Sequence, residues 1–85
     1  MNSAIIKNEL GLHARPITKW LEAIKILDAD ITVICKGKKY NGNSMIGLMS
    51  MAAKKGDELS IESEGTDSEK AIKMLLDLIE DGFGE

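Results

Sequence analysis

The sequence predicts a two-layer α+β fold, in which a four-stranded antiparallel sheet is covered on one face by three helices in the order βαββαβα. Three observations support this prediction. Apolar residues recur at helical spacing in three segments, and four other short segments show strand patterns. The chain has 85 residues, of which 44% are hydrophobic and only one is proline. This size and composition are typical of one packed domain, and we expect it to span residues 1–85.

A strand and a helix are expected in the first third of the chain. Residues 4–6 form a short apolar run and the turn-forming residues 8–11 follow, so the strand should end near Lys7. Pro16 then suits the first turn of a helix, where its missing N–H is not needed. The apolar stripe of this helix consists of Ile17, Trp20, Leu21, Ile24 and Leu27. Because Trp20 falls on that stripe, core packing is favoured for it over stacking on a ligand.

Two further strands are expected in the middle of the chain. Residues 28–30 interrupt the helical pattern, and apolar residues then alternate with other residues over 31–36. The expected inward-facing positions are Ile31, Val33 and Cys35. Residues 36–39 suit a hairpin turn that leads into a short strand at residues 39–41. We therefore expect Cys35 to be a small buried hydrophobic residue.

A short second helix is expected over residues 45–51, which are almost all apolar. Ser44 stands immediately before this run, at the N-cap position, where a hydroxyl oxygen accepts a hydrogen bond from a backbone N–H. Such a cap contributes about 1 kcal/mol relative to alanine. Residues 54–56 should stop the helix, and Lys54 and Lys55 would then complement the negative end of its dipole.

The last third of the chain predicts a strand and a long helix. Apolar and polar residues alternate over residues 59–64, which predicts a strand with one polar face. Thr66 and Glu69 have the spacing of a capping box, and Asp67 is the alternative N-cap. The helix should continue to Gly82. Its expected buried stripe consists of Ala71, Ile72, Leu75, Leu78 and Ile79.

Charge and cysteine content exclude several classes of protein. The net charge is -3, whereas a nucleic-acid surface needs clustered Lys and Arg in excess. The single cysteine, Cys35, excludes an internal disulfide and does not support a zinc site, and no cofactor or metal is expected. No run approaches the roughly 18 apolar residues that span a bilayer, and the N-terminus lacks a signal-peptide pattern. We therefore expect a cytoplasmic protein without membrane insertion or direct contact with nucleic acid.

The candidate functional site lies between the first strand and the first helix, in the segment Gly11-Leu12-His13-Ala14-Arg15-Pro16. Free backbone N–H groups and the positive end of the dipole at a helix start stabilise a dianionic group. The neutral imidazole of His13 is a good nucleophile near pH 7, and the forked donors of Arg15 match phosphoryl oxygens. Pro16 fixes the backbone where the helix begins. The alternative for a lone histidine in a loop is an ordinary solvated surface position.

Three segments of the chain resemble HPr, the histidine-containing phosphocarrier family of the bacterial sugar phosphotransferase system. Residues 11–16 are similar to the active-site signature of that family, and residues 43–51 are similar to its regulatory-serine segment. Residues 82–85, Gly-Phe-Gly-Glu, are similar to the tail of HPr proteins from low-GC Gram-positive bacteria. The resemblance covers essentially the whole chain and implies the open-faced β-sandwich of the family, which has the same order of elements.

The resemblance implies that the chain is a phosphocarrier and not an enzyme. On this basis His13 is phosphorylated on Nδ1 by enzyme I, which draws on phosphoenolpyruvate. The group then passes to a IIA-type component of a sugar transporter. Arg15 would steady the phosphoryl oxygens in both transfers. No metal is implied for the carrier, because enzyme I and the acceptor supply the rest of each transition state.

Ser44 has a structural and a regulatory interpretation. The resemblance adds the second, since the matching serine of Gram-positive HPr is phosphorylated by an HPr kinase/phosphorylase. In the family, the modified form is a poorer substrate for enzyme I and a corepressor for a catabolite-control repressor. The alternative function of the chain is therefore a regulatory binding module, which acts through Ser44 phosphorylation on a transcriptional repressor or enzyme partner.

A docking surface for partner proteins is expected beside His13. The apolar residues of the second helix cannot all be buried on so short a helix, so some should form an adaptable exposed patch. The alternative is that most of them belong to the core. The expected docking residues are Ala14, Thr18, Met45, Ile46, Leu48 and Met49. The sequence departs from the family pattern at Ile17, Trp20, Asn43, Met45 and Ile46. These departures leave open whether the chain is a housekeeping sugar carrier or a specialised paralogue.

Overall fold

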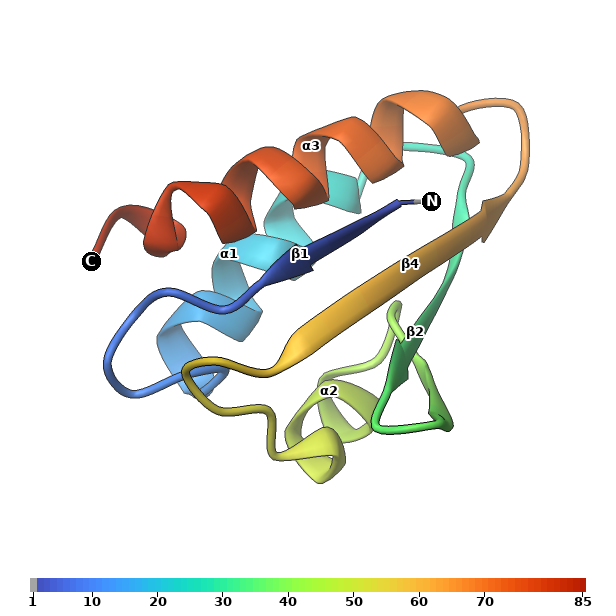
Figure 1. The fold of residues 1–85 in the computed structure, drawn as a ribbon. Coiled ribbons are helices and arrows are strands. Elements are labelled where there is room, and N and C mark those ends of the chain that lie inside the picture. The colour runs from blue at the N-terminus through green and yellow to red at the C-terminus, as the bar shows by residue number, and fades with distance from the viewer. Residues whose placement is uncertain (1) are drawn as a thin grey trace.

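The computed structural model describes residues 2–85 and confirms the predicted order of elements (Figure 1). The strands are β1 (Ser3–Ile5), β2 (Asp30–Cys35), β3 (Lys38–Asn41) and β4 (Glu58–Glu64), and the helices are α1 (Ala14–Ile24), α2 (Met45–Met51) and α3 (Ser68–Glu80). A short 3-10 helix, η1 (Gly82–Gly84), follows α3 where the sequence patterns predicted only the end of the last helix. Within residues 2–85, no helix has the length and apolar character needed to cross a membrane.

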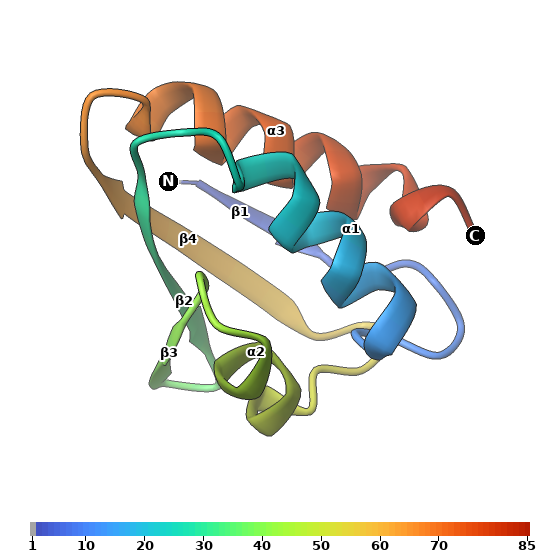
Figure 2. The same cartoon turned by 180° about the vertical axis from the view of Figure 1, so that it is seen from behind.

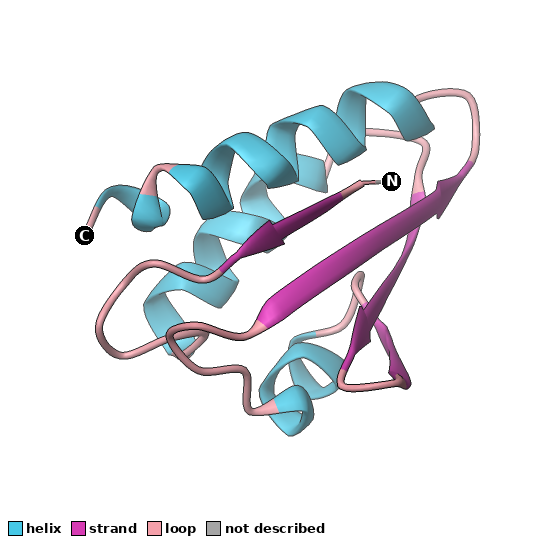
Figure 3. Cartoon of the chain, viewed as in Figure 1, coloured by secondary structure: helices cyan, strands magenta, loops and turns pink. Residues whose placement is uncertain are grey.

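The four strands form one antiparallel sheet in the order β1-β4-β2-β3, so β1 and β3 are its edges (Figure 3). Val33 lies opposite Ile61 and Ala4 lies opposite Leu59, and all four side chains are buried. Their neighbours along each strand point to the opposite, open face. The helices pack on the buried face, and Figure 2 shows the molecule from the side of α1 and α2. This arrangement confirms the predicted α+β open-faced sandwich.

The hydrophobic core lies between the sheet and the helices. Trp20 of α1 is fully buried, and its Nε1–H donates a hydrogen bond of 2.8 Å to the backbone oxygen of Gly42. This placement confirms the prediction of core packing for Trp20. Ile31, Val33 and Cys35 are also buried, as the alternation predicted, and burial raises the pKa of the Cys35 thiol.

The segment after α2 differs from the prediction. The helix ends at Met51, because Ala52 adopts a left-handed conformation with φ of 51° and donates its N–H back into the last turn. Lys54 and Lys55 therefore lie beyond the helix, and the prediction that they form its C-terminal charge pair is wrong. The ammonium group of Lys55 instead pairs with the carboxylate of Glu9 at 2.7 Å.

The start of α3 also differs from the prediction. Asp67 occupies the N-cap position, but its side chain makes no capping hydrogen bond and instead accepts one of 2.8 Å from the backbone N–H of Asp28. The hydroxyl of Thr66 donates to a carboxylate oxygen of Asp28 at 2.8 Å. Hydrogen bonds from the Thr66 backbone and side chain lower the pKa of Asp28. The predicted capping box of Thr66 and Glu69 is therefore wrong, because Thr66 binds the segment between α1 and β2.

Candidate functional site

His13 occupies the N-cap position of α1, directly before the first helical residue. Its imidazole makes no capping hydrogen bond and its side chain is 36% exposed, so the ring is available to other groups. Gly11 sets the path of the preceding loop, since its φ is +68° and a Cβ there would lie 2.5 Å from the backbone oxygen of Ala53. The N–H of Leu12 donates to that same oxygen at 2.9 Å. The loop is thereby fixed against the segment that follows α2.

The first turn of α1 presents free hydrogen-bond donors next to His13. Within residues 2–85 the N–H groups of Ala14 and Arg15 donate no backbone hydrogen bond, and Pro16 has no N–H to leave unpaired. Pro16 lies in this first turn, as predicted, and its side chain is buried. The turn closes at Ile17, whose N–H donates to the backbone oxygen of His13 at 3.0 Å. With the positive end of the helix dipole, the two free amides form an environment suited to an anion.

The structure brings His13, Ala14 and Arg15 together in one open surface depression. The depression is lined by Leu10, His13, Ala14, Arg15, Lys19, Gly84 and Glu85. Arg15 is exposed, and Lys19 adds a second cation whose Nζ donates a hydrogen bond to the backbone oxygen of Phe83. The depression therefore holds two cationic side chains beside the positive end of the helix dipole, in a chain whose net charge is -3.

Two further residues of this site, Asn8 and Glu85, were missed by the sequence analysis. The Oε1 atom of Glu85 lies 3.3 Å from Nε2 of His13 and accepts a hydrogen bond of 3.1 Å from Nδ2 of Asn8. Asn8 also donates to the backbone oxygen of Gly11 at 2.7 Å. Because Asn8 and Glu85 are 77 positions apart, no local pattern reveals their contact. The one available signal is the similarity of residues 82–85 to an HPr tail.

The charge state of Glu85 follows from these neighbours. Partial burial raises its pKa, but the hydrogen bonds from His13 and Asn8, together with the charges of His13 and Arg15, lower it by more. The pKa of Glu85 is therefore below its ordinary value, and the side chain is ionised at neutral pH. A carboxylate thus faces Nε2 of His13, and the other ring nitrogen, Nδ1, takes no part in this contact.

Ser44 is the N-cap of α2, as predicted. Its Oγ accepts a hydrogen bond of 3.1 Å from the backbone N–H of Gly47. Gly42, two residues before Ser44, accepts the hydrogen bond from Trp20 in the middle of α1. The end of α2 adjoins the loop before His13 instead. The start of α2 therefore lies further from the first turn of α1 than the end of α2 does (Figure 2).

α2 exposes three of its apolar side chains. Met45, Ile46 and Met49 are exposed, Ile46 by 80%, which confirms that part of the apolar run lies outside the core. Leu48 is fully buried, so its prediction as a docking residue is wrong. Leu48 and Met51 both face the core, because positions three apart lie on the same side of a helix.

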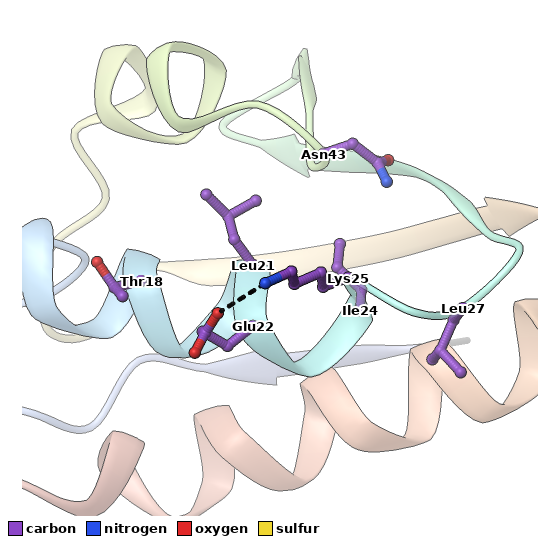
Figure 4. A pocket seen from close by; sticks show the side chains of 7 residues that line it. All are labelled: Thr18, Leu21, Glu22, Ile24, Lys25, Leu27 and Asn43. Carbon is purple, nitrogen blue, oxygen red and sulfur yellow. Dashed lines mark ion pairs between the residues drawn. The ribbon is translucent and has the colours of Figure 1, made fainter.

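A groove runs between α1 and the segment that leads into α2 (Figure 4). It is lined by Thr18, Leu21, Glu22, Ile24, Lys25, Leu27 and Asn43. Thr18 is exposed, and its hydroxyl donates to the backbone oxygen of Ala14 at 2.9 Å. Ala14, Thr18 and Leu21 follow one another at helical spacing and form one strip along α1. Both docking residues predicted on α1 therefore lie on a strip that begins next to His13.

Comparison with known proteins places this fold and sequence in a family. Residues 2–81 match the family model described as the PTS HPr component phosphorylation site. The chain is 39% identical over 80 residues to phosphocarrier protein HPr of Neisseria meningitidis serogroup A. The aligned residues cover 94% of this chain and 90% of that protein. It is 40% identical over 84 residues to the multiphosphoryl transfer protein of Escherichia coli O157:H7, and the aligned residues cover 95% of this chain. The chain spans only 22% of the length of that second relative.

A solved structure supports the same assignment. The crystal structure of HPr-C-His from Thermoanaerobacter tengcongensis is similar to this one with a TM-score of 0.91 and 41% sequence identity. The similarity covers 98% of this chain and 93% of that chain. Family model, sequence identity and fold agree with the resemblance that residues 11–16 and 43–51 suggested. The chain belongs to the HPr family of phosphocarrier proteins of the phosphotransferase system.

Proposed function

We propose that this chain carries a phosphoryl group on Nδ1 of His13, in the cytoplasm. Enzyme I charged by phosphoenolpyruvate supplies the group, and a IIA-type component of a sugar transporter receives it. The observation that carries this proposal is the place of His13. It stands at the N-cap of α1 with an uncommitted imidazole nitrogen, beside two free backbone amides and the guanidinium of Arg15.

Each transfer is a displacement at phosphorus. The lone pair of His13 Nδ1 forms a bond to the phosphorus atom as the bond between phosphorus and enzyme I breaks, and the electron pair of that bond stays with enzyme I. The three phosphoryl oxygens then lie near the N–H groups of Ala14 and Arg15 and the Arg15 side chain, which balance their negative charge. In the second transfer the nucleophile of the IIA-type component attacks, and the electron pair returns to Nδ1.

The relay is tested by following a labelled phosphoryl group. The chain is charged by enzyme I and radiolabelled phosphoenolpyruvate, separated from both, and mixed with a IIA-type component. We expect the label to move from the chain to the IIA-type component after the two are mixed. A labelled chain that keeps its phosphoryl group in the presence of several IIA-type components would leave acceptance intact and contradict the carrier role.

Arg15→Lys is expected to fold normally and to slow both transfers by about tenfold. A point charge replaces a planar fork that spans two phosphoryl oxygens, and a hydrogen bond to a charged group is worth about 1.5–3 kcal/mol before screening by solvent. The rates are measured below saturation with enzyme I and then with the IIA-type component. Lys25→Ala removes an exposed cation at the C-cap of α1, the opposite end from His13, and should leave both rates unchanged. Equal rates for wild type and Arg15→Lys would remove Arg15 from the site.

The proposal extends to Ser44 as a regulatory site and to exposed side chains of α1 and α2 as a docking surface. This surface consists of Ala14, Thr18, Met45, Ile46 and Met49. An HPr kinase/phosphorylase would add a phosphate to Ser44, where the helix dipole favours negative charge and the fold is retained. The phosphate would weaken apolar docking by its desolvation cost and create a surface that a catabolite-control repressor recognises.

Ser44→Asp is expected to retain a melting temperature within about 3 °C of wild type and to lower the rate of His13 phosphorylation by enzyme I several-fold. The added charge is tolerated at a helix start but opposes contact with an apolar partner surface. Ser68→Asp is the matched control, because it adds the same charge at the start of α3, where Asp67 is bound to Asp28 in the segment between α1 and β2. Equal rates for the three proteins, measured below saturation, would leave Ser44 as a helix cap only.

A further inference from the structure

The tail of the chain is held in place beside His13. Phe83 is buried in the core, although its backbone adopts a left-handed φ of 58°. The Nζ atom of Lys19 donates a hydrogen bond to the backbone oxygen of Phe83. Burial of one side chain and a hydrogen bond from α1 therefore determine the path of residues 82–85. Glu85 reaches the depression around His13 as a consequence of this packing.

Asn8 connects this tail to the loop that carries His13. Its side chain is only 6% exposed, and Nδ2 donates both to the backbone oxygen of Gly11 and to Oε1 of Glu85. Within residues 2–85 its buried Oδ1 atom finds no hydrogen-bond partner. An unpaired buried oxygen destabilises a fold, so Asn8 is costly to bury compared with an apolar side chain. The two hydrogen bonds that its Nδ2 donates offset this cost. Asn8 thus holds the loop and the Glu85 carboxylate in one arrangement.

The contact of Glu85 with His13 selects one form of the imidazole. An ionised carboxylate only accepts hydrogen bonds, so the 3.3 Å contact with Nε2 requires that this nitrogen carry the proton. A neutral imidazole has a single N–H, and Nδ1 then holds the lone pair. The nitrogen that the carboxylate contacts is therefore not the nitrogen that the proposed transfer uses.

We propose that Glu85, held by Asn8, is a positioning residue that keeps the proton of His13 on Nε2 and presents the lone pair of Nδ1 to the phosphoryl donor. The consequence for transfer rests on the proposed function, whereas the position of the proton does not. When Nδ1 bonds to phosphorus the ring gains positive charge, and a carboxylate on Nε2–H stabilises that charge, as carboxylates do behind other histidines.

The proton position is measured by two-dimensional ¹H–¹⁵N NMR of the imidazole in protein labelled at its single histidine. The spectra are recorded at about pH 8.5, well above the pKa of about 6.5 of a free imidazole. We expect wild type to hold the Nε2–H form predominantly. Glu85→Ala should lower the ratio of Nε2–H to Nδ1–H by about two- to fivefold, the range for a partly exposed pair. Glu85→Gln keeps one acceptor oxygen and should fall between the two.

The matched control is Glu80→Ala, which removes a carboxylate that pairs with Lys7 near the same end of the chain. It should leave the ratio unchanged, and Asn8→Ala should lower it in the same direction as Glu85→Ala. A ratio in Glu85→Ala equal to that of wild type, or a proton on Nδ1 in wild type, would overturn the inference. No shift in a folded Asn8→Ala would overturn the part assigned to Asn8.

A rate measurement tests the consequence. Glu85→Ala should reduce kcat for phosphoryl acceptance from enzyme I about two- to fivefold with little change in KM, since the docking side chains are untouched. Faster acceptance would show that the carboxylate competes with the incoming group and would overturn the inference. If wild type itself accepts no phosphoryl group, the proposed function fails, while the NMR ratio still decides whether Glu85 positions the proton.

Discussion

His13→Ala is expected to lose all phosphoryl acceptance from enzyme I while keeping its fold. His13 is the only histidine of the chain, so its removal leaves no imidazole to accept the phosphoryl group at the start of α1. The fold should persist because the side chain makes no capping bond, and its contact with Glu85 is a partly exposed pair of the kind that contributes little to stability. Acceptance is measured by intact mass, and stability by thermal melting.

The matched control for this variant is Leu10→Ala. Leu10 lines the same depression and is exposed, but it offers no group that bonds to phosphorus. Leu10→Ala should still take up one phosphoryl group, at a rate close to that of wild type. An acid-labile phosphoryl group on folded His13→Ala would place the acceptor elsewhere in the chain.

Trp20→Ala is expected to cost about 3–5 kcal/mol of folding free energy, the usual effect of emptying a large buried aromatic site. Trp20 is fully buried, and its loss also leaves the backbone oxygen of Gly42 without its 2.8 Å hydrogen bond. Domains of this size have a total stability of about 5–15 kcal/mol, so the variant should unfold at much lower urea concentration. Because His13 is the N-cap of α1, phosphoryl acceptance should fall at temperatures where the variant is partly unfolded.

Urea unfolding followed by far-UV circular dichroism measures this effect without relying on tryptophan fluorescence. Ile26→Ala is the control, since Ile26 is 88% exposed just beyond α1 and its truncation should change stability by less than about 0.5 kcal/mol. A loss below about 1 kcal/mol for Trp20→Ala would contradict the assignment of Trp20 to the core. It would revive the alternative of a ligand-stacking side chain.

The fold was predictable because its elements have strong and different periodicities. Ile31, Val33 and Cys35 alternate with less buried neighbours, and the register of β2 and β4 buries that face as expected. The stripe on α1 was predicted for the same reason, and Ile17 and Trp20 are fully buried. Leu27, the last residue assigned to that stripe, lies beyond the end of α1, so its placement on the helix is wrong. These patterns are local, so they can be recognised from the amino-acid sequence alone.

The wrong predictions arise where polar and apolar residues do not alternate clearly, or where a residue distant in sequence takes the expected hydrogen bond. Residues 45–51 contain almost no polar side chain, so the sequence offers no contrast by which to tell that Leu48 faces the core and Ile46 does not. Thr66 has the residue type and spacing of a helix cap, yet Asp28, 38 positions earlier, takes its hydroxyl. The contacts of Glu85 with His13 and Asn8 likewise depend on how the tail packs, which no local pattern encodes.

Phosphoryl transfer to His13 is tested most directly by incubating the wild-type chain with enzyme I and phosphoenolpyruvate and measuring its intact mass before and after acid treatment. NMR of the charged chain then locates the group on the imidazole. We expect a gain of one phosphoryl group that is lost in acid and that is bonded to Nδ1 of His13. A chain that gains no phosphoryl group under conditions in which enzyme I is charged, or that gains it on any other atom, would contradict the carrier role assigned to His13.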